Sequence, residues 1–105
     1  MTKQMKGTEM DDMQLSEVLK RLMQAGGFSA MSRVTMFKGY RTNTHGQMKA
    51  VMVELYDAGP EKPGLRYQVI ARDEDGRVAT GNPADGLEAV LANVHWWELD
   101  GHPRP

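Results

Sequence analysis

The chain contains no cysteine, which excludes disulfide bonds, thiolate metal ligands and a cysteine nucleophile. It also has no apolar run approaching the roughly 18 residues that mark a membrane-spanning helix. The N-terminal stretch MTKQMKGTEMDD lacks the apolar core of a secretory signal. From these three absences we expect a cytoplasmic protein that does not enter a membrane.

Catalytic and metal-binding motifs are lacking as well. There is neither a G-x-S-x-G motif nor a P-loop. The acidic run 73–75 precedes Gly76 and is typical of a solvated turn rather than a pair of catalytic carboxylates. The spacing of His95, Asp100 and His102 matches no strong metal motif. We therefore expect no enzyme activity, metal or cofactor, and a chelator should leave the melting temperature unchanged.

The composition that remains is that of a globular domain. The chain has 105 residues, of which 40% are hydrophobic and 26% are charged. That length supports one hydrophobic core rather than two. We predict a single domain over residues 11–100, with flexible tails at residues 1–10 and 101–105.

Apolar residues at helical spacing predict a first helix near the N-terminus. Thr8 and Asp11 resemble a capping box at its start, and Gly26 and Gly27 favour its end. The stripe consists of Leu15, Val18, Leu19, Leu22 and Met23.

A second helix is predicted near the C-terminus. Asn82 is a good N-cap and Pro83 suits the first helical position. On this helix Trp97 falls on the apolar stripe and is expected in the core, whereas Trp96 points about 100° away and is expected to be less buried. The stripe consists of Leu87, Val90, Leu91, Val94 and Trp97.

Four segments between the helices have strand character, namely residues 33–40, 47–57, 65–72 and 77–81. The loop AGPEKPG and the turn DEDG separate the later ones. We therefore predict an α+β fold of order α-β-β-β-β-α. It would be an antiparallel three- to four-stranded meander with two helices on one face, covering Val51, Val53, Leu55, Tyr67 and Val69.

Residues 51–92 run strand, GPEKPG, strand, DEDG, strand, GNP, helix. This order resembles the second half of a double-stranded-RNA-binding domain, which has a GP-containing loop between its first two strands and a glycine-rich link to its last helix. In that family, lysines at the start of the helix contact phosphates across a groove. The matching positions here are Ala84, Asp85 and Glu88, and Lys62 is nearest to the family's loop histidine. We therefore expect no binding to duplex RNA.

The hairpin between the first two strands is expected to turn at residues 43–46, because Asn43 and Gly46 suit a turn. That tip would place Phe37 opposite Met52 and Arg41 opposite Met48. A one-residue slip would move such a set to the other face. The predicted open face carries Arg33, Phe37, Arg41, Met48, Met52 and Tyr56, joined by Arg66, Ile70 and Arg72.

Charge is unevenly distributed along the chain. Residues 28–53 carry four basic residues and no acid, whereas residues 54–100 carry ten acids against four bases. Because aromatic residues, methionine and arginine are enriched at interfaces, we predict a small non-enzymatic interaction module. It would bind a protein, or a second copy as a homodimer, with Tyr40 and Arg41 at the contact. Its small size also suits a phage-encoded adaptor or inhibitor.

Binding of single-stranded nucleic acid on the same face is the alternative prediction. Phe37, Tyr40 or Tyr56 would stack on bases. The phosphates would be met by Arg33, Arg66 and Arg72. Such a complex should weaken steeply with added salt, whereas an apolar protein interface should not.

Overall fold

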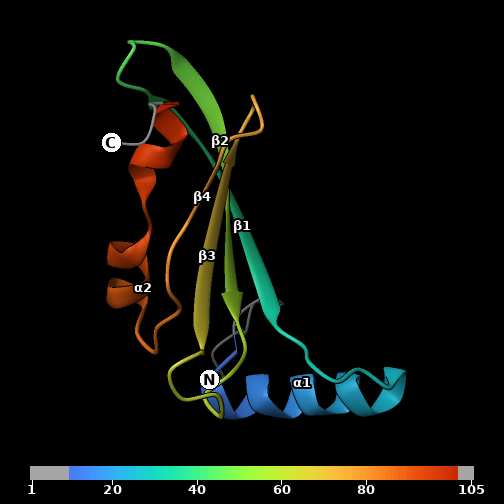
Figure 1. Ribbon diagram of the computed structural model, residues 1–105. Coiled ribbons are helices and arrows are strands. Elements are labelled where there is room, and N and C mark those ends of the chain that lie inside the picture. Colours follow the sequence, from blue (N-terminus) through green and yellow to red (C-terminus); the bar gives the residue numbers. More distant parts are fainter. Residues whose placement is uncertain (1–9, 102–105) are drawn as a thin grey trace, which may run out of the picture.

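The computed structural model describes residues 10–101 of the chain. The predicted α+β class and the order α-β-β-β-β-α are confirmed, with a short 3₁₀ helix added after the last α-helix (Figure 1). The predicted tails fall almost wholly outside the described residues. The elements are α1 (Asp12–Gly26), β1 (Arg33–Thr42), β2 (Met48–Asp57), β3 (Tyr67–Asp73), β4 (Val78–Thr80), α2 (Leu87–Asn93) and η1 (Trp96–Asp100).

The four strands form one antiparallel meander in the order β1-β2-β3-β4. β1 and β2 are both ten residues long and stay paired over their whole length. β3 and β4 are shorter, with seven and three residues. The sheet is therefore dominated by the long β1–β2 hairpin, and β1 forms one of its edges.

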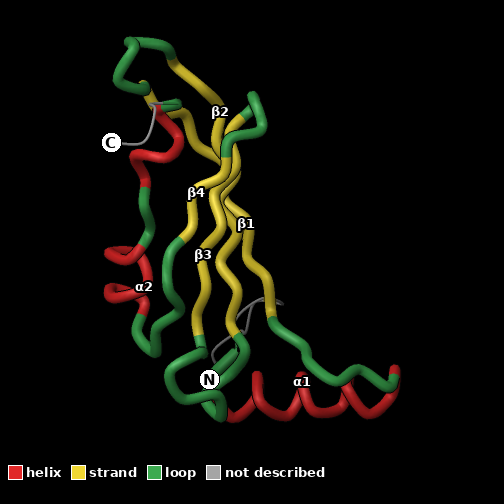
Figure 2. Tube along the Cα trace, viewed as in Figure 1, coloured by secondary structure: helices red, strands yellow, loops and turns green. Residues whose placement is uncertain are grey.

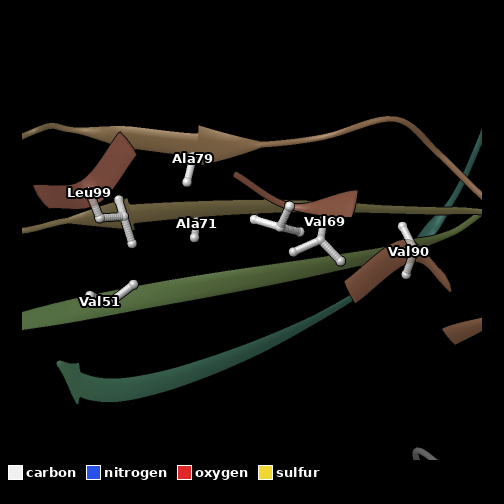
Figure 3. Close-up of a cluster of buried hydrophobic side chains, with 7 residues drawn as sticks. Val51, Val69, Ala71, Ala79, Val90 and Leu99 are labelled. Atoms are coloured by element: carbon white, nitrogen blue, oxygen red, sulfur yellow. The ribbon is translucent and has the colours of Figure 1, made fainter. Parts of the chain in front are cut away.

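One face of the sheet, here called the inner face, holds the main core. Val69, Ala71 and Ala79 are fully buried on β3 and β4. Val90 of α2 and Leu99 of η1 pack against them, as Figure 3 shows. Because α2 and η1 contact β3 and β4, they cover that half of the inner face and leave the β1 side uncovered.

The first helix flanks the sheet at one end and runs across the ends of the strands (Figure 2). Asp11 and Gln14 form its capping box, and Gly27 ends it in the left-handed conformation with φ 71°. The expected cap at Thr8 lies outside the described residues. Leu15 and Leu19 are buried, but α1 supplies no residue to the core cluster over the sheet.

The second α-helix begins later than predicted. Its N-cap is Gly86, so the assignment of Asn82 and Pro83 to the helix start is wrong. Ala84 instead exchanges two backbone hydrogen bonds with Tyr67, at 2.9 and 3.1 Å. This bridge keeps the link extended up to the helix.

The environments of the two tryptophans are also the reverse of the prediction. α2 ends at Asn93, so the helical phase that pointed Trp97 into the core does not reach it. Trp96 packs against the core, whereas Trp97 is 43% exposed and stacks on His95 with the ring centres 5.8 Å apart. No helix among the described residues is long and apolar enough to cross a bilayer.

Candidate protein-interaction surface

The tip of the β1–β2 hairpin is organised by the side chain of Asn43. Its Oδ1 accepts hydrogen bonds from the backbone N–H groups of His45 and Gln47, at 2.9 and 3.0 Å. The Asn43 N–H donates to the carbonyl of Gln47 at 2.8 Å, and Gly46 has φ 80°. The turn was therefore correctly located, but the loop spans residues 43–47, one residue more than predicted.

That extra residue overturns the predicted register. Phe37 lies opposite Val53 and Arg41 opposite Lys49, so the pairings with Met52 and Met48 are wrong. Because successive side chains of a strand alternate between faces, the shift moves the odd-numbered residues of β1 to the inner face. Those residues include Arg33, Phe37 and Arg41. Phe37 is nevertheless 56% exposed, because α2 and η1 pack mainly against β3 and β4.

The opposite face of the sheet, here called the outer face, carries the even-numbered residues of all four strands. Met48, Met52 and Tyr56 are on this face as predicted, and Tyr40, which was not in the predicted outer-face set, lies on it as well. Tyr40 is 67% and Met48 68% exposed, so the half of the hairpin next to its tip presents large apolar side chains to solvent. The exposed large apolar residues of this face are Val34, Met36, Tyr40, Met48, Met52 and Val78.

Arg41 is part of an internal ion pair. Its guanidinium donates to both carboxylate oxygens of Asp100 in η1, at 2.7 and 3.4 Å. Asp100 is only 4% exposed, so this pair fastens the hairpin end to the C-terminal 3₁₀ helix. The predicted role of Arg41 as an exposed partner contact does not fit this position.

Arg66 is also held by carboxylates of its own chain. It donates to Asp57 at the end of β2 and to Asp12 in the first turn of α1, with closest distances of 2.8 Å to each. The hydrogen bond that it donates to Asp57, and then that to Asp12, raise the pKa of the guanidinium. Arg66 therefore ties α1 to the sheet and does not contribute to the outer face.

Arg72 is the one predicted arginine that lies on the outer face, and it too is paired. It donates to Glu54 at 2.6 Å, and the Tyr56 hydroxyl donates to the same oxygen at 3.0 Å. The bond from Arg72, reinforced by that from Tyr56, lowers the pKa of the Glu54 carboxyl. In return, hydrogen bonding to Glu54 raises the pKa of Tyr56.

The main groove and the acidic side chains offer no catalytic or metal-binding arrangement among the described residues. A groove of about 430 Å³ between α1 and the loop 58–65 is lined largely by aliphatic side chains, among them Leu19, Met23 and Leu65. Within residues 10–101, no three histidine or acidic side chains gather as metal ligands would.

Sequence reasoning missed Val34 and Met36 on the outer face and Asp100 as the partner of Arg41. Val34, Met36 and Tyr40 share one parity in β1, which was a usable signal. Nothing in the sequence pairs Arg41 with Asp100, which is 59 residues away.

The fold and this surface define a class: an α+β domain with an open apolar sheet face beside a long edge strand. No protein-family model, curated protein or solved structure matches the chain. The resemblance of residues 51–92 to a double-stranded-RNA-binding domain stays a prediction.

Proposed function

We propose that this chain is a small non-enzymatic interaction module, an adaptor or inhibitor, that binds a protein partner through the outer face of its hairpin. The observation that supports this proposal is the exposure of Tyr40 and Met48 beside Met36 and Met52, on a face without a covering helix in the described part of the chain. Monomeric proteins rarely leave such contiguous apolar patches in water, because burying them is favourable.

Pairing of the arginines argues against the alternative, single-stranded nucleic acid. Arg41, Arg66 and Arg72 each bind a carboxylate of their own chain, so their charge is already neutralised. A phosphate backbone would have to displace those carboxylates. Binding of duplex RNA is not proposed either, because Asp85, at a position where the family that residues 51–92 resemble carries lysine, accepts a hydrogen bond from the Gly64 N–H.

The test is quantitative capture of partners by the immobilised full chain from cells that produce it. We expect Tyr40→Glu and Met48→Glu to lose the captured protein, because each places a charge in an apolar contact. Met13→Glu is the matched control, since Met13 is also a largely exposed apolar side chain but lies on α1. All three variants should melt within a few degrees of the parent chain.

Two outcomes would overturn the proposal. One is equal capture by the outer-face variants and the Met13 control. The other is a captured complex that nuclease removes and that weakens steeply with salt, which indicates nucleic acid. The mass of the pure chain in solution shows whether the bound protein is a second copy.

A further inference from the structure

We propose that the free edge of β1 accepts an extended acidic segment of the partner as an additional antiparallel strand. This inference rests on the proposed function and specifies how the partner is held. β1 is the edge of the sheet and pairs only with β2 among the described elements. It is ten residues long, which is about twice the usual strand length.

Hydrogen-bond alternation shows which groups of β1 are available. The backbone N–H of Asn43 donates to the carbonyl of Gln47, so these two residues form a hydrogen-bonded pair. The same register pairs Arg41 with Lys49 and Phe37 with Val53. In an antiparallel pair only every second residue exchanges hydrogen bonds with its neighbour. The odd-numbered residues of β1 therefore bond to β2, and the even-numbered residues direct their N–H and C=O groups outward. These outward residues are Val34, Met36, Lys38, Tyr40 and Thr42.

The β2–β3 pairing confirms this phase. Ala58 donates to the carbonyl of Arg66, and Glu74 donates to the carbonyl of Ala50. The even-numbered residues of β2 thus bond to β3, which leaves its odd-numbered residues for β1.

Proline, β-bulges and charged side chains usually protect an edge strand from pairing with another chain, and β1 has few of these features. β1 has no proline, and its register with β2 runs without a bulge from Arg33 to Thr42. Lys38 is the only charged residue among the outward set. An edge of this length without protection is the surface on which strand addition occurs.

The basic residues of β1 favour an added strand with acidic side chains. β1 carries Arg33, Lys38 and Arg41 and no acid. The Lys38 ammonium lies 5.7 Å from the centre of the Tyr40 ring, and no carboxylate within the described residues is recorded as its partner. An acidic side chain of the added strand would therefore meet the Lys38 ammonium on the outer face, and opposite charges across a strand pair are favourable.

The same charges disfavour a second copy as the added strand. Two copies of β1 pairing antiparallel over nearly their full length have two registers that match the outward residues. One places Arg33 opposite Arg41 of the second copy, and the other places Lys38 opposite Lys38. Like charges directly opposite one another destabilise a strand pair. The occupant is therefore a different, acidic chain.

Side chains of the added strand would be received on both faces. On the outer face they would lie beside Met36 and Tyr40. On the inner face, a Cβ built on Gly39 meets nothing within 4 Å, and Phe37 next to it is exposed. The added strand therefore has open space for apolar side chains between its acids.

The experiment uses the full chain and synthetic ten-residue peptides of valine and threonine, with glutamates placed opposite and diagonally across from Lys38 in the antiparallel register. One version is N-methylated on the amides that would face β1, and its matched control on the amides that would face away. We expect the first to bind at least about tenfold more weakly, because several hydrogen bonds are lost. The control should bind like the unmethylated peptide.

Two further readouts locate the peptide. Amide hydrogen exchange should slow at Met36, Lys38 and Tyr40 when it binds, and change little at the neighbouring odd-numbered residues. Lys38→Glu should reduce binding of the glutamate peptide and improve binding of a version with lysines in place of glutamates.

The inference is overturned if both methylated peptides bind equally, or if the lysine peptide binds the parent chain as well as the glutamate peptide. It is also overturned if the Met36 and Tyr40 amides are protected in a dimer without peptide. In each case, loss of capture by Met48→Glu would still support the proposed function, because Met48 lies on β2, away from this edge.

Discussion

The two adjacent tryptophans differ in burial because α2 ends at Asn93, before them, and they lie in the 3₁₀ helix η1. Trp96 is partly buried and packs against the core cluster. Trp97 starts from the next Cα and reaches the surface, where it stacks on His95. At the residue scale, the side chain that stabilises the fold is therefore Trp96.

We expect Trp96→Ala to cost about 3–5 kcal/mol of unfolding free energy, the usual loss for a large aromatic side chain in a core. Trp97→Ala should cost only about 1 kcal/mol, because it removes a partly exposed stacking contact. Denaturant unfolding of both variants measures the difference. Equal losses would contradict this assignment.

The ion pair between Arg41 and Asp100 yields a second prediction at this scale. Arg41→Ala removes the cation from a buried carboxylate and should cost about 3 kcal/mol. Lys49→Ala, which breaks the more exposed pair with Asp75, should cost less than about 1 kcal/mol. A melt in which the two variants are equally stable would show that Arg41 is not structural.

At the scale of elements, α1 depends on few connections to the sheet. It adds no side chain to the main core, and the Arg66 guanidinium bridges Asp12 of α1 and Asp57 of β2. Its buried residues Leu15 and Leu19 face the loop region, where Leu19 lies close to Gly59. The helix is thus positioned by one arginine and a small apolar contact.

Arg66→Gln should therefore loosen α1. We expect a loss of about 1–3 kcal/mol, the range for hydrogen bonds to charged groups, together with faster amide exchange in α1 than in β3. Arg21→Gln is the control, because its pair with Glu17 lies within the exposed helix surface and contributes less than about 0.5 kcal/mol. Unchanged exchange in α1 would mean that the apolar contact alone holds it.

At the scale of the whole molecule, several carboxylates form ion pairs that lower their pKa values in the folded state. Arg66 lowers the pKa of Asp12, Arg72 that of Glu54 and Lys49 that of Asp75, in each case chiefly through a hydrogen bond. A group with a lowered folded pKa stabilises the protein above its unfolded pKa. This contribution is lost as the pH falls through the folded pKa.

Stability should therefore be level near neutrality and should fall as the pH drops below the ordinary values of 4.5 for Glu54 and 3.8 for Asp12 and Asp75. Thermal melts between neutral and strongly acid pH measure the decline. Glu54→Gln should show a shallower decline than the parent chain, because one such carboxylate has been removed. A decline of unchanged steepness would exclude Glu54 as a contributor.

Local sequence signals determined the element order, the antiparallel meander, the first helix with its Gly27 end, and the hairpin turn at Asn43. These depend on apolar spacing and on residues with restricted backbone preferences, which act within a few positions of the chain. The outer-face positions of Met48, Met52 and Tyr56 were correctly predicted from their parity opposite to Val51, Val53 and Leu55.

Tertiary structure alone decided the register of β1, the start of α2 and the partners of the arginines. A loop one residue longer at 43–47 is a small difference locally, yet it exchanges the faces of every β1 side chain. The bridge from Ala84 to Tyr67 delays α2, and Asp100 reaches Arg41 across 59 residues. The start of α2 and the partner of Arg41 depend on contacts between segments far apart in sequence, about which local preference carries no information. The register depends on a single residue of loop length, which turn preferences do not distinguish.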